Sequence, residues 1–232
     1  MRDIYIALSG ASAAWDNLSS IAHNVANSKT QGFREARTTF ELAGAPPSAN
    51  GSGLGPLYVA AGNTTYNTQD GDLEIDDDPN HLALRGDGFF ALEGGTFTRD
   101  GSFQIDGEGT LVTSDGTPVL SENGPIQLAP GETFNVGPDG TVNGSVSGNL
   151  GKLSIATLGN PAPLGGNRWG GTPSADPPDG TTVVQGALEG SNADTMRGMI
   201  EMMEASRYFE AEQKAMQASD DLRARLNRIG GS

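Results

Sequence analysis

A regular apolar stripe near the N-terminus constrains the fold of this chain more than any other feature. Apolar side chains recur there in alternating steps of four and three, at Ile4, Leu8, Ala11, Trp15, Leu18, Ala22 and Val25. This heptad pattern is typical of a helix that lies along another helix. The sequence therefore predicts a helix over residues 2–27 that needs a helical partner.

Two apolar residues of this segment, Ile6 and Ile21, lie off the stripe, and Ile6 falls near the opposite face. They are compatible with a two-helix hairpin that leaves a few apolar side chains exposed, which is common. They are also compatible with a helix that contacts more than one neighbour. We favour the second interpretation.

A second long helical pattern runs from about Ala193 to Ile229, and Gly230 follows it. The polar residues at 191, 192 and 194 can cap its N-terminus. Its apolar residues form two stripes on different faces. The first holds Met196, Met199, Ile200 and Met203 and continues as Ala211, Ala215, Ala218, Leu222, Leu226 and Ile229; the second holds Met202, Phe209 and Met216. A glycine inside a helix costs about 1 kcal/mol relative to alanine, so we expect packing around Gly198 to offset that cost.

The middle of the chain is typical of β structure. Between Leu82 and Leu158, short apolar runs alternate with Asp-Gly and Asn-Gly dipeptides, which adopt the positive φ angles of tight hairpin turns. This recurrence predicts an antiparallel meander that closes as a small barrel or sandwich. Two flanking stretches rich in Gly and Pro are expected to be irregular: residues 43–62, and residues 159–180 with Trp169 as their anchor.

The predicted fold class is therefore α+β, with the terminal helices paired as a coiled coil around a central antiparallel β domain of barrel or sandwich type. We divide the chain into an N-terminal helix with its following turn (1–33), an extended connector (34–80), the β domain with its return (81–184) and a C-terminal helix (185–232).

Composition excludes several functions. The formal charge of −15 argues against binding to nucleic acid or to anionic lipid. The chain has no Cys and two His, which gives no disulfide, no catalytic thiol and no ordinary zinc site. No apolar run approaches the about 20 residues of a membrane span, and the N-terminus does not fit a cleaved secretory signal. We expect no catalytic, cofactor-binding or metal-binding residues and no enzymatic activity.

Two local motifs could indicate a binding site for a small ion. Carboxylates at Asp72, Glu74 and Asp76 alternate with apolar residues, which fits a calcium site or a solvated strand face. The spacing does not match an EF-hand loop, so we favour the strand. The Gly86-Asp87-Gly88 run could be taken for a phosphate loop, but no helical pattern follows it, and we interpret it as a turn.

Three groups of residues, in the same order along the chain, resemble the bacterial flagellar rod and hook axial proteins. The first is the run Asn24-Val25-Ala26-Asn27 with Thr30, Gly32 and Phe33. The second lies in the β region, at 86–90, 97–103, 109–113 and 118–126. The third is the run from Gln185 to Asn192, followed by Met199-Ile200 and by residues 207–210. Within the family the chain most resembles a proximal-rod subunit, with a distal-rod subunit as the alternative. Arg197 and Gly198 depart from the family pattern.

The resemblance implies a structural subunit that polymerises through its terminal helices into the rod, which transmits torque from rotor to hook across the periplasmic space. The implied partners are like subunits in a helical assembly, other proximal-rod proteins, the distal-rod protein and the flagellar type III export apparatus. An extracellular β-domain binding module with oligomerising ends is the alternative from another class.

If the function is mechanical, its site is a protein interface. The stripes and the family motif predict that this interface comprises Ile4, Leu8, Ala11, Trp15, Leu18, Ala22, Val25, Asn27, Thr30, Gly32, Phe33, Met199, Ile200, Met202, Met203, Phe209, Met216, Leu222 and Leu226.

Overall fold

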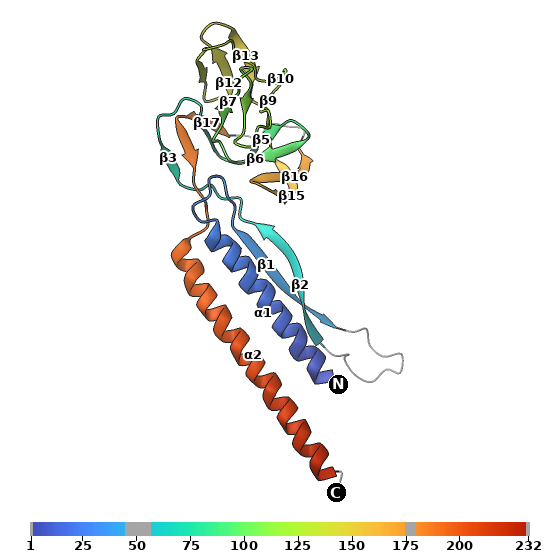
Figure 1. Cartoon of the computed structure of the whole chain (residues 1–232). Coiled ribbons are helices and arrows are strands. Elements are labelled where there is room, and N and C mark those ends of the chain that lie inside the picture. Colours follow the sequence, from blue (N-terminus) through green and yellow to red (C-terminus); the bar gives the residue numbers. More distant parts are fainter. Residues whose placement is uncertain (1, 45–56, 175–179, 231–232) are drawn as a thin grey trace. The chain divides into compact units, whose positions relative to one another are not determined.

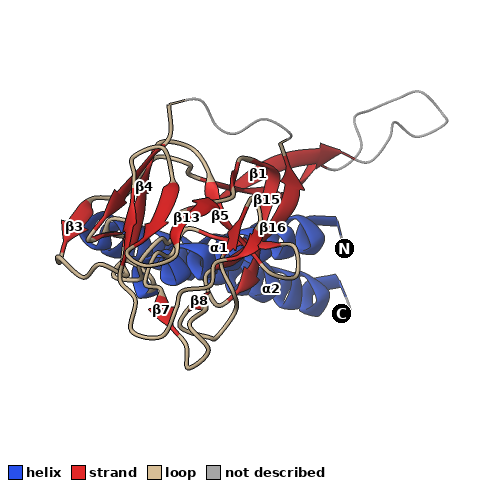
Figure 2. Ribbon diagram, turned by 90° about the horizontal axis from the view of Figure 1, so that it is seen from above, coloured by secondary structure: helices blue, strands red, loops and turns tan. Residues whose placement is uncertain are grey.

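In the computed structural model, which describes residues 2–44, 57–174 and 180–230, the chain forms two compact units. Unit 1 comprises residues 1–26, 36–66 and 194–232, and unit 2 comprises residues 27–35 and 67–193. The two long helices belong to unit 1, while the described part of unit 2 consists of strands, turns and loops (Figure 2).

Unit 1 is a helix pair with a β hairpin. Helix α1 spans Arg2–Ala26 and helix α2 spans Thr195–Gly230, which confirms both helices expected from the heptad and stripe patterns. Asp194 caps α2, because its Oδ1 accepts hydrogen bonds from the amides of Met196 at 2.8 Å and Arg197 at 3.1 Å. The two helices lie side by side, and the hairpin runs along α1 (Figure 1).

The hairpin pairs β1 (Ala36–Gly44) with β2 (Leu57–Tyr66) in antiparallel register, from Ala36 opposite Tyr66 to Gly44 opposite Leu57. Residues 57–62 were expected to be loop, and that prediction is wrong. The run Leu57-Tyr58-Val59 favours a strand, and cross-strand pairing with β1 extends it through Ala60, Ala61 and Gly62, whose strand propensity is low. Residues 45–56 of the same Gly/Pro-rich stretch lie outside the described residues.

Unit 2 is built from short antiparallel strands. They are β3 (Leu73–Ile75), β4 (Leu82–Arg85), β5 (Phe89–Leu92), β6 (Thr96–Thr98), β7 (Gln104–Ile105), β8 (Leu111–Val112), β9 (Leu120–Ser121), β10 (Gly124–Pro125), β11 (Phe134–Val136), β12 (Thr141–Gly144), β13 (Gly148–Lys152), β14 (Ile155–Ala156), β15 (Leu158–Gly165), β16 (Arg168–Pro173), β17 (Thr182–Gln185) and β18 (Ala187–Glu189). They confirm the predicted antiparallel β region.

Of the two predicted forms of the β domain, a barrel or a sandwich, the closed barrel is wrong. In the described part of unit 2 the strands form a five-stranded sheet in the order β14-β5-β6-β16-β15, a three-stranded sheet β11-β12-β13, and two-stranded pairs. The larger sheets keep free edges because most strands have only two to five residues, too few to tilt and pair around a barrel. Residues 159–173 are also more regular than expected, since they belong largely to the paired strands β15 and β16, while residues 175–179 of the same stretch lie outside the described residues.

The core of unit 2 lies between these sheets. Fourteen buried side chains form one apolar cluster, and two of them, Phe90 and Phe103, meet edge to face with ring centroids 5.1 Å apart. Trp169 is buried against Phe89 at 5.7 Å, which confirms its predicted role as an anchor. Aromatic contacts of this geometry contribute about 0.5–1.5 kcal/mol beyond the area they bury.

Candidate functional site

One face of α1 is occupied by the hairpin of unit 1. Three polar side chains on that face bind the strands. Asn24 accepts a hydrogen bond from the Ala36 amide at 2.9 Å and donates one to the Ala36 carbonyl at 2.8 Å. Ser20 also donates to the Ala36 carbonyl, and Ser9 accepts from the amide of Val59. This face is therefore committed to intramolecular contacts.

A second face of α1 packs on α2. The ring of Trp15 lies 6.0 Å from that of Phe209. A Cβ atom on Gly198 would stand 2.5 Å from Cγ2 of Val25, and one on Gly10 would stand 4.0 Å from Cδ of Glu212. In these contacts, higher residue numbers in α1 are paired with lower residue numbers in α2, so the two helices run antiparallel.

The predicted stripe on α1 divides into two rows with spacings of seven residues. In one row, Ala11 is buried and Leu18 and Val25 are half-buried, while the side chain of Ile4 lies outside the described part of the chain. In the other row, Leu8, Trp15 and Ala22 are exposed. Half of the stripe therefore faces solvent in the single subunit.

Sequence reasoning missed part of the buried face of α1. Ala13, Ala14 and Ile21 are buried, although Ile21 was placed off the stripe. The signal that could have found this face is a third apolar row, Ala7, Ala14 and Ile21, which also has a spacing of seven.

The two stripes of α2 differ in the same way. Met202, Phe209 and Met216 are half-buried, whereas Met196, Met199, Ile200 and Met203 are each more than half exposed. The exposed four follow the i, i+3, i+4, i+7 spacing of one helix face. The side chains of Leu222 and Leu226 lie outside the described residues. We call Met196, Met199, Ile200 and Met203, together with Leu8 and Trp15, the exposed helix rows.

The family-motif residues Asn27, Thr30, Gly32 and Phe33 lie in unit 2 and form a turn after α1. Thr30 donates from its hydroxyl to Oδ1 of Asn27 at 3.2 Å, and the Phe33 amide donates to the Thr30 carbonyl. The Gly32 amide donates to the carbonyl of Glu189 at 2.8 Å. The turn therefore binds the first run of the third sequence motif, at Glu189.

Gly32 has two reasons to be glycine. Its φ angle is +65°, a conformation that other residues rarely adopt. A Cβ atom there would also stand 2.5 Å from the backbone of Arg99 and Asp100. These contacts are internal to unit 2, and they give the motif a folding role.

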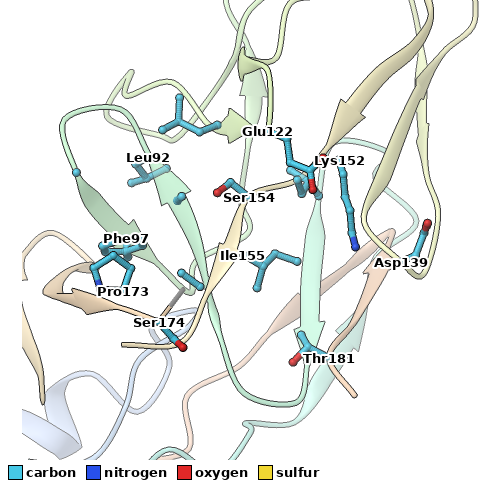
Figure 3. Close-up of a pocket in the computed structure, with 15 residues that line it drawn as sticks. Leu92, Phe97, Glu122, Asp139, Lys152, Ser154, Ile155, Pro173, Ser174 and Thr181 are labelled. Atoms are coloured by element: carbon cyan, nitrogen blue, oxygen red, sulfur yellow. The ribbon is translucent and has the colours of Figure 1, made fainter. Parts of the chain in front are cut away.

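A pocket of about 440 Å³ opens beside β5 and β14 in unit 2 (Figure 3). Leu92, Phe97 and Ile155 give it an apolar floor, and Glu122, Asp139 and Lys152 line one side. A hydrogen bond from the hydroxyl of Thr141 lowers the pKa of Asp139. The Asp139 carboxylate therefore stabilises the turn in which it lies. Among the described residues that line the pocket there is no His, and no nucleophile is paired with a base.

Two other carboxylates, Glu132 and Asp76, also have lowered pKa values because of local hydrogen bonds. Glu132 accepts hydrogen bonds from the amides of Ala129, Val146 and Ser147 and from the Ser147 hydroxyl, which together lower its pKa to about 2. Asp76 pairs with His81, and that hydrogen bond lowers the pKa of Asp76. In the described ranges, no group of three or more His, Asp or Glu side chains could hold a metal ion.

Neither helix, over the residues described, is long and apolar enough to cross a bilayer.

Comparison with known families matches two regions. The profile described as "Flagellar basal body rod FlgEFG protein C-terminal" matches residues 184–229, and the profile "Flagellar hook protein FlgE/F/G D1 domain" matches residues 83–144. The first region covers β18 and α2, and the second covers the strands from β4 to β12.

Whole-chain relatives carry two names. The chain is 32% identical over 259 residues to the flagellar basal-body rod protein FlgG of Bacillus subtilis, covering 96% of each chain. It is 28% identical over 249 residues to the flagellar basal-body rod protein FlgF of Escherichia coli, covering 97% of each. It is 32% identical over 224 residues to FlgF of Mesorhizobium japonicum, covering 90% of each.

Proposed function

The chain belongs to the flagellar basal-body rod protein family, and we propose that it fills the FlgF role, as a subunit of the proximal rod. It is a structural subunit of the basal-body rod. The observation that supports a polymerising subunit most directly is the pair of exposed helix rows, since a folded single chain gains nothing from six large apolar side chains in water.

We propose that these rows pack on the terminal helices of neighbouring subunits as coiled-coil seams, so that residues 1–33 and 185–232 build the inner layer of the rod. Burial of a side chain of the size of Leu or Met contributes about 1.5–3 kcal/mol. Six such side chains per subunit, repeated along a helical assembly, suffice to hold a rigid shaft without covalent links.

The distribution of charge supports assembly through unit 1. Its sequence carries ten Asp and Glu against eight Lys and Arg, whereas unit 2 carries 19 against six. Copies that pack through the nearly neutral unit therefore meet little electrostatic repulsion, while unit 2 supplies most of the net charge of −15.

The distal-rod role of FlgG is the alternative. The alignments with the FlgG chains extend over 257–269 residues, whereas those with the FlgF chains extend over 224–249, and this chain has 232. The longer FlgG alignments need more insertions, which supports the FlgF role.

The remaining parts of the proposal follow from the rod role. The subunit leaves the cell through the flagellar type III export apparatus and assembles in the periplasmic space with like subunits, other proximal-rod proteins and the distal-rod protein. It performs no catalysis, and the pocket beside β14 is consistent with that role because its described wall offers no nucleophile paired with a base.

The test is a pair of matched substitutions on exposed positions of α2. Ile200→Asp places a charge in an exposed row and should abolish rods in basal bodies viewed by electron microscopy, while the purified monomer keeps its helix content. Gln217→Asp places the same charge at an exposed polar position and should leave rods intact. Normal rods with Ile200→Asp would contradict the proposal. Gold labelling of a tagged copy near the base of the rod, rather than beyond it, separates the proximal from the distal role.

A further inference from the structure

The chain passes between its two units four times, at residues 26/27, 35/36, 66/67 and 193/194. On the unit 2 side, these four passages begin or end in three short segments, residues 27–35, 67–71 and 189–193. Ordinary linkers of this kind are mobile. In unit 2, all three segments are bound to one another.

Four charged side chains connect these segments. Glu189 accepts a hydrogen bond from Arg99 Nε through its Oε2, and its Oε1 forms an ion pair with Arg34 Nη2 at 2.9 Å. Asp70 Oδ1 lies 2.8 Å from Arg99 Nη2 and 3.4 Å from Arg34 Nη2. Three of the four are almost fully buried, with exposed side-chain fractions of 4% for Arg34 and 1% for Arg99 and Glu189, against 32% for Asp70.

The backbone satisfies the remaining polar atoms of this group. Arg99 donates to the carbonyls of Leu84, Gly86 and Gly88, and Arg34 donates to that of Gln69. Glu189 Oε1 accepts from the Gly71 amide at 3.0 Å, and Asp70 Oδ2 accepts from the Gly86 amide at 2.7 Å. The group is balanced, with two positive and two negative charges.

The side-chain amide of Asn192, next to the passage at 193/194, bonds the backbone beside two other passages, those at 35/36 and 66/67. Its Oδ1 accepts from the Glu35 amide at 2.7 Å, and its Nδ2 donates to the carbonyls of Asn67 at 2.9 Å and Gln69 at 2.8 Å. Backbone bonds extend the same arrangement: Gly32 donates to Glu189, Asn67 to Glu35, and Gly190 to Asp72.

Burial makes these charges depend on each other. Desolvation lowers the pKa of Arg34, and the charge of Glu189 opposes that shift. Removal of one partner from a buried ion pair leaves an uncompensated charge and is strongly destabilising. A loosened segment would separate such partners, so the network resists movement of each passage.

We propose that Arg34, Asp70, Arg99, Glu189 and Asn192 form a clasp that holds together the three unit 2 segments in which the four passages begin or end, so that twisting load is shared among four connections. This inference rests on the proposed rod function, because a subunit that transmits torque needs a stiff connection between its units.

Hydrogen exchange of the purified monomer tests the clasp without reference to rods. Glu189→Gln keeps the shape of the side chain and removes its charge. The amides of Gly32, Asn67 and Gly190, whose bonds use backbone acceptors, should then exchange on the order of 100-fold faster. The Leu111 amide, which donates to Ile126 in the core of unit 2, should change little. Glu74→Gln, on the exposed face of β3, is the matched control and should change none of these amides.

Two results would overturn the proposal. Unchanged exchange at the three amides would show that the charges do not hold the passages. Equal acceleration at Leu111 would show that the network stabilises unit 2 as a whole. Because Glu189→Gln could prevent folding, Asn192→Ala provides a milder variant that removes three hydrogen bonds, and about tenfold faster exchange is expected at the same amides.

The role in torque is tested separately in cells. A strain with Asn192→Ala should assemble rods but swim more slowly than one with the control Glu74→Gln, and normal swimming would overturn that role. Absence of rods in the Ile200→Asp strain concerns assembly alone, so failure of the clasp and failure of the rod proposal are distinguishable.

Discussion

The ring of Trp15 in α1 lies 6.0 Å from the ring of Phe209 in α2, tilted by 52°, while 60% of the Trp15 surface remains exposed. One side of the indole therefore packs within the subunit, and the other is available to a neighbour. This division of one side chain between two contacts is the pattern of α1 as a whole, where buried and exposed apolar rows alternate.

Trp15→Ala should consequently affect the monomer and the rod differently. Truncation of a fully buried Trp costs about 3–5 kcal/mol. With most of its surface exposed, we expect a loss of about 1–2 kcal/mol in the free energy of unfolding of the monomer, measured by urea denaturation followed by circular dichroism. Rod assembly, scored by electron microscopy of basal bodies, should fail.

The control for Trp15 is Ser19→Ala, at an exposed position of the same helix. It should leave both stability and assembly unchanged. If Trp15→Ala cells build normal rods, the exposed row of α1 is not an interface.

Gly198 should be intolerant of alanine because of Val25. In an open helix position the change from Gly to Ala gains about 1 kcal/mol. Here the added Cβ would stand 2.5 Å from Val25 Cγ2, and a β-branched side chain in a helix has essentially one rotamer and cannot turn away. Overpacking of this kind costs about 1–3 kcal/mol, so we expect Gly198→Ala to lower the thermal midpoint of the helical signal.

A double substitution checks the cause. In a Val25→Ala background the clash is absent, so Gly198→Ala should raise the midpoint instead. The same sign in both backgrounds would show that Val25 and Gly198 do not limit the approach of the helices.

The helices and the β region could be predicted because their signals are local. The heptad spacing from Ile4 to Val25 and the recurring Asp-Gly and Asn-Gly turns depend on residues close together in sequence. The hairpin β1–β2 gave only a weak local signal, the short strand-like run Thr38-Thr39-Phe40. Its second strand continues through Ala60, Ala61 and Gly62 and is stabilised by pairing and by contacts with α1, which a local pattern does not reveal.

The candidate site shows the same limit. The apolar spacing found the rows but could not say that Leu8 and Trp15 face solvent while Ile21 is buried, because the hairpin covers one face of α1. The clasp could not be found at all: Arg34, Asp70, Arg99 and Glu189 are far apart in an acidic sequence, where carboxylates are uninformative until the fold brings them together.

Asn24 should matter for the attachment of the hairpin to α1. Its amide group makes two hydrogen bonds with the backbone of Ala36, as a neighbouring strand would. Asn24→Ala leaves the Ala36 amide without that acceptor, and we expect a loss of about 1–3 kcal/mol in the free energy of unfolding. The amide of Ala36 should also exchange faster with solvent, as measured by mass spectrometry or NMR.

Asn17→Ala, at another half-buried position of α1, is the comparison for Asn24. It should leave the exchange of Ala36 unchanged. Equal protection of Ala36 in the Asn24→Ala protein would contradict a role for this side chain in holding the hairpin.

Glu132 should make unit 2 sensitive to acid. Four hydrogen bonds to its carboxylate lower its pKa from about 4.5 to about 2 in the folded protein. A carboxyl group whose pKa is depressed by folding stabilises the fold above its unfolded pKa, and that stabilisation disappears as pH falls through the folded value. The contribution of Glu132 should therefore be complete above about pH 5 and decline between pH 4.5 and 2.

Urea denaturation of unit 2 at a series of pH values, with Glu132→Gln beside the parent protein, measures this contribution as a difference. The two proteins should differ by a constant amount from pH 7 to about 5, and the difference should shrink as the solution is acidified toward pH 2. Glu93→Gln, an exposed carboxylate in the same unit, should show no such trend. A difference that stays constant down to pH 2 would mean that the loop at 145–147 does not depend on the charge of Glu132.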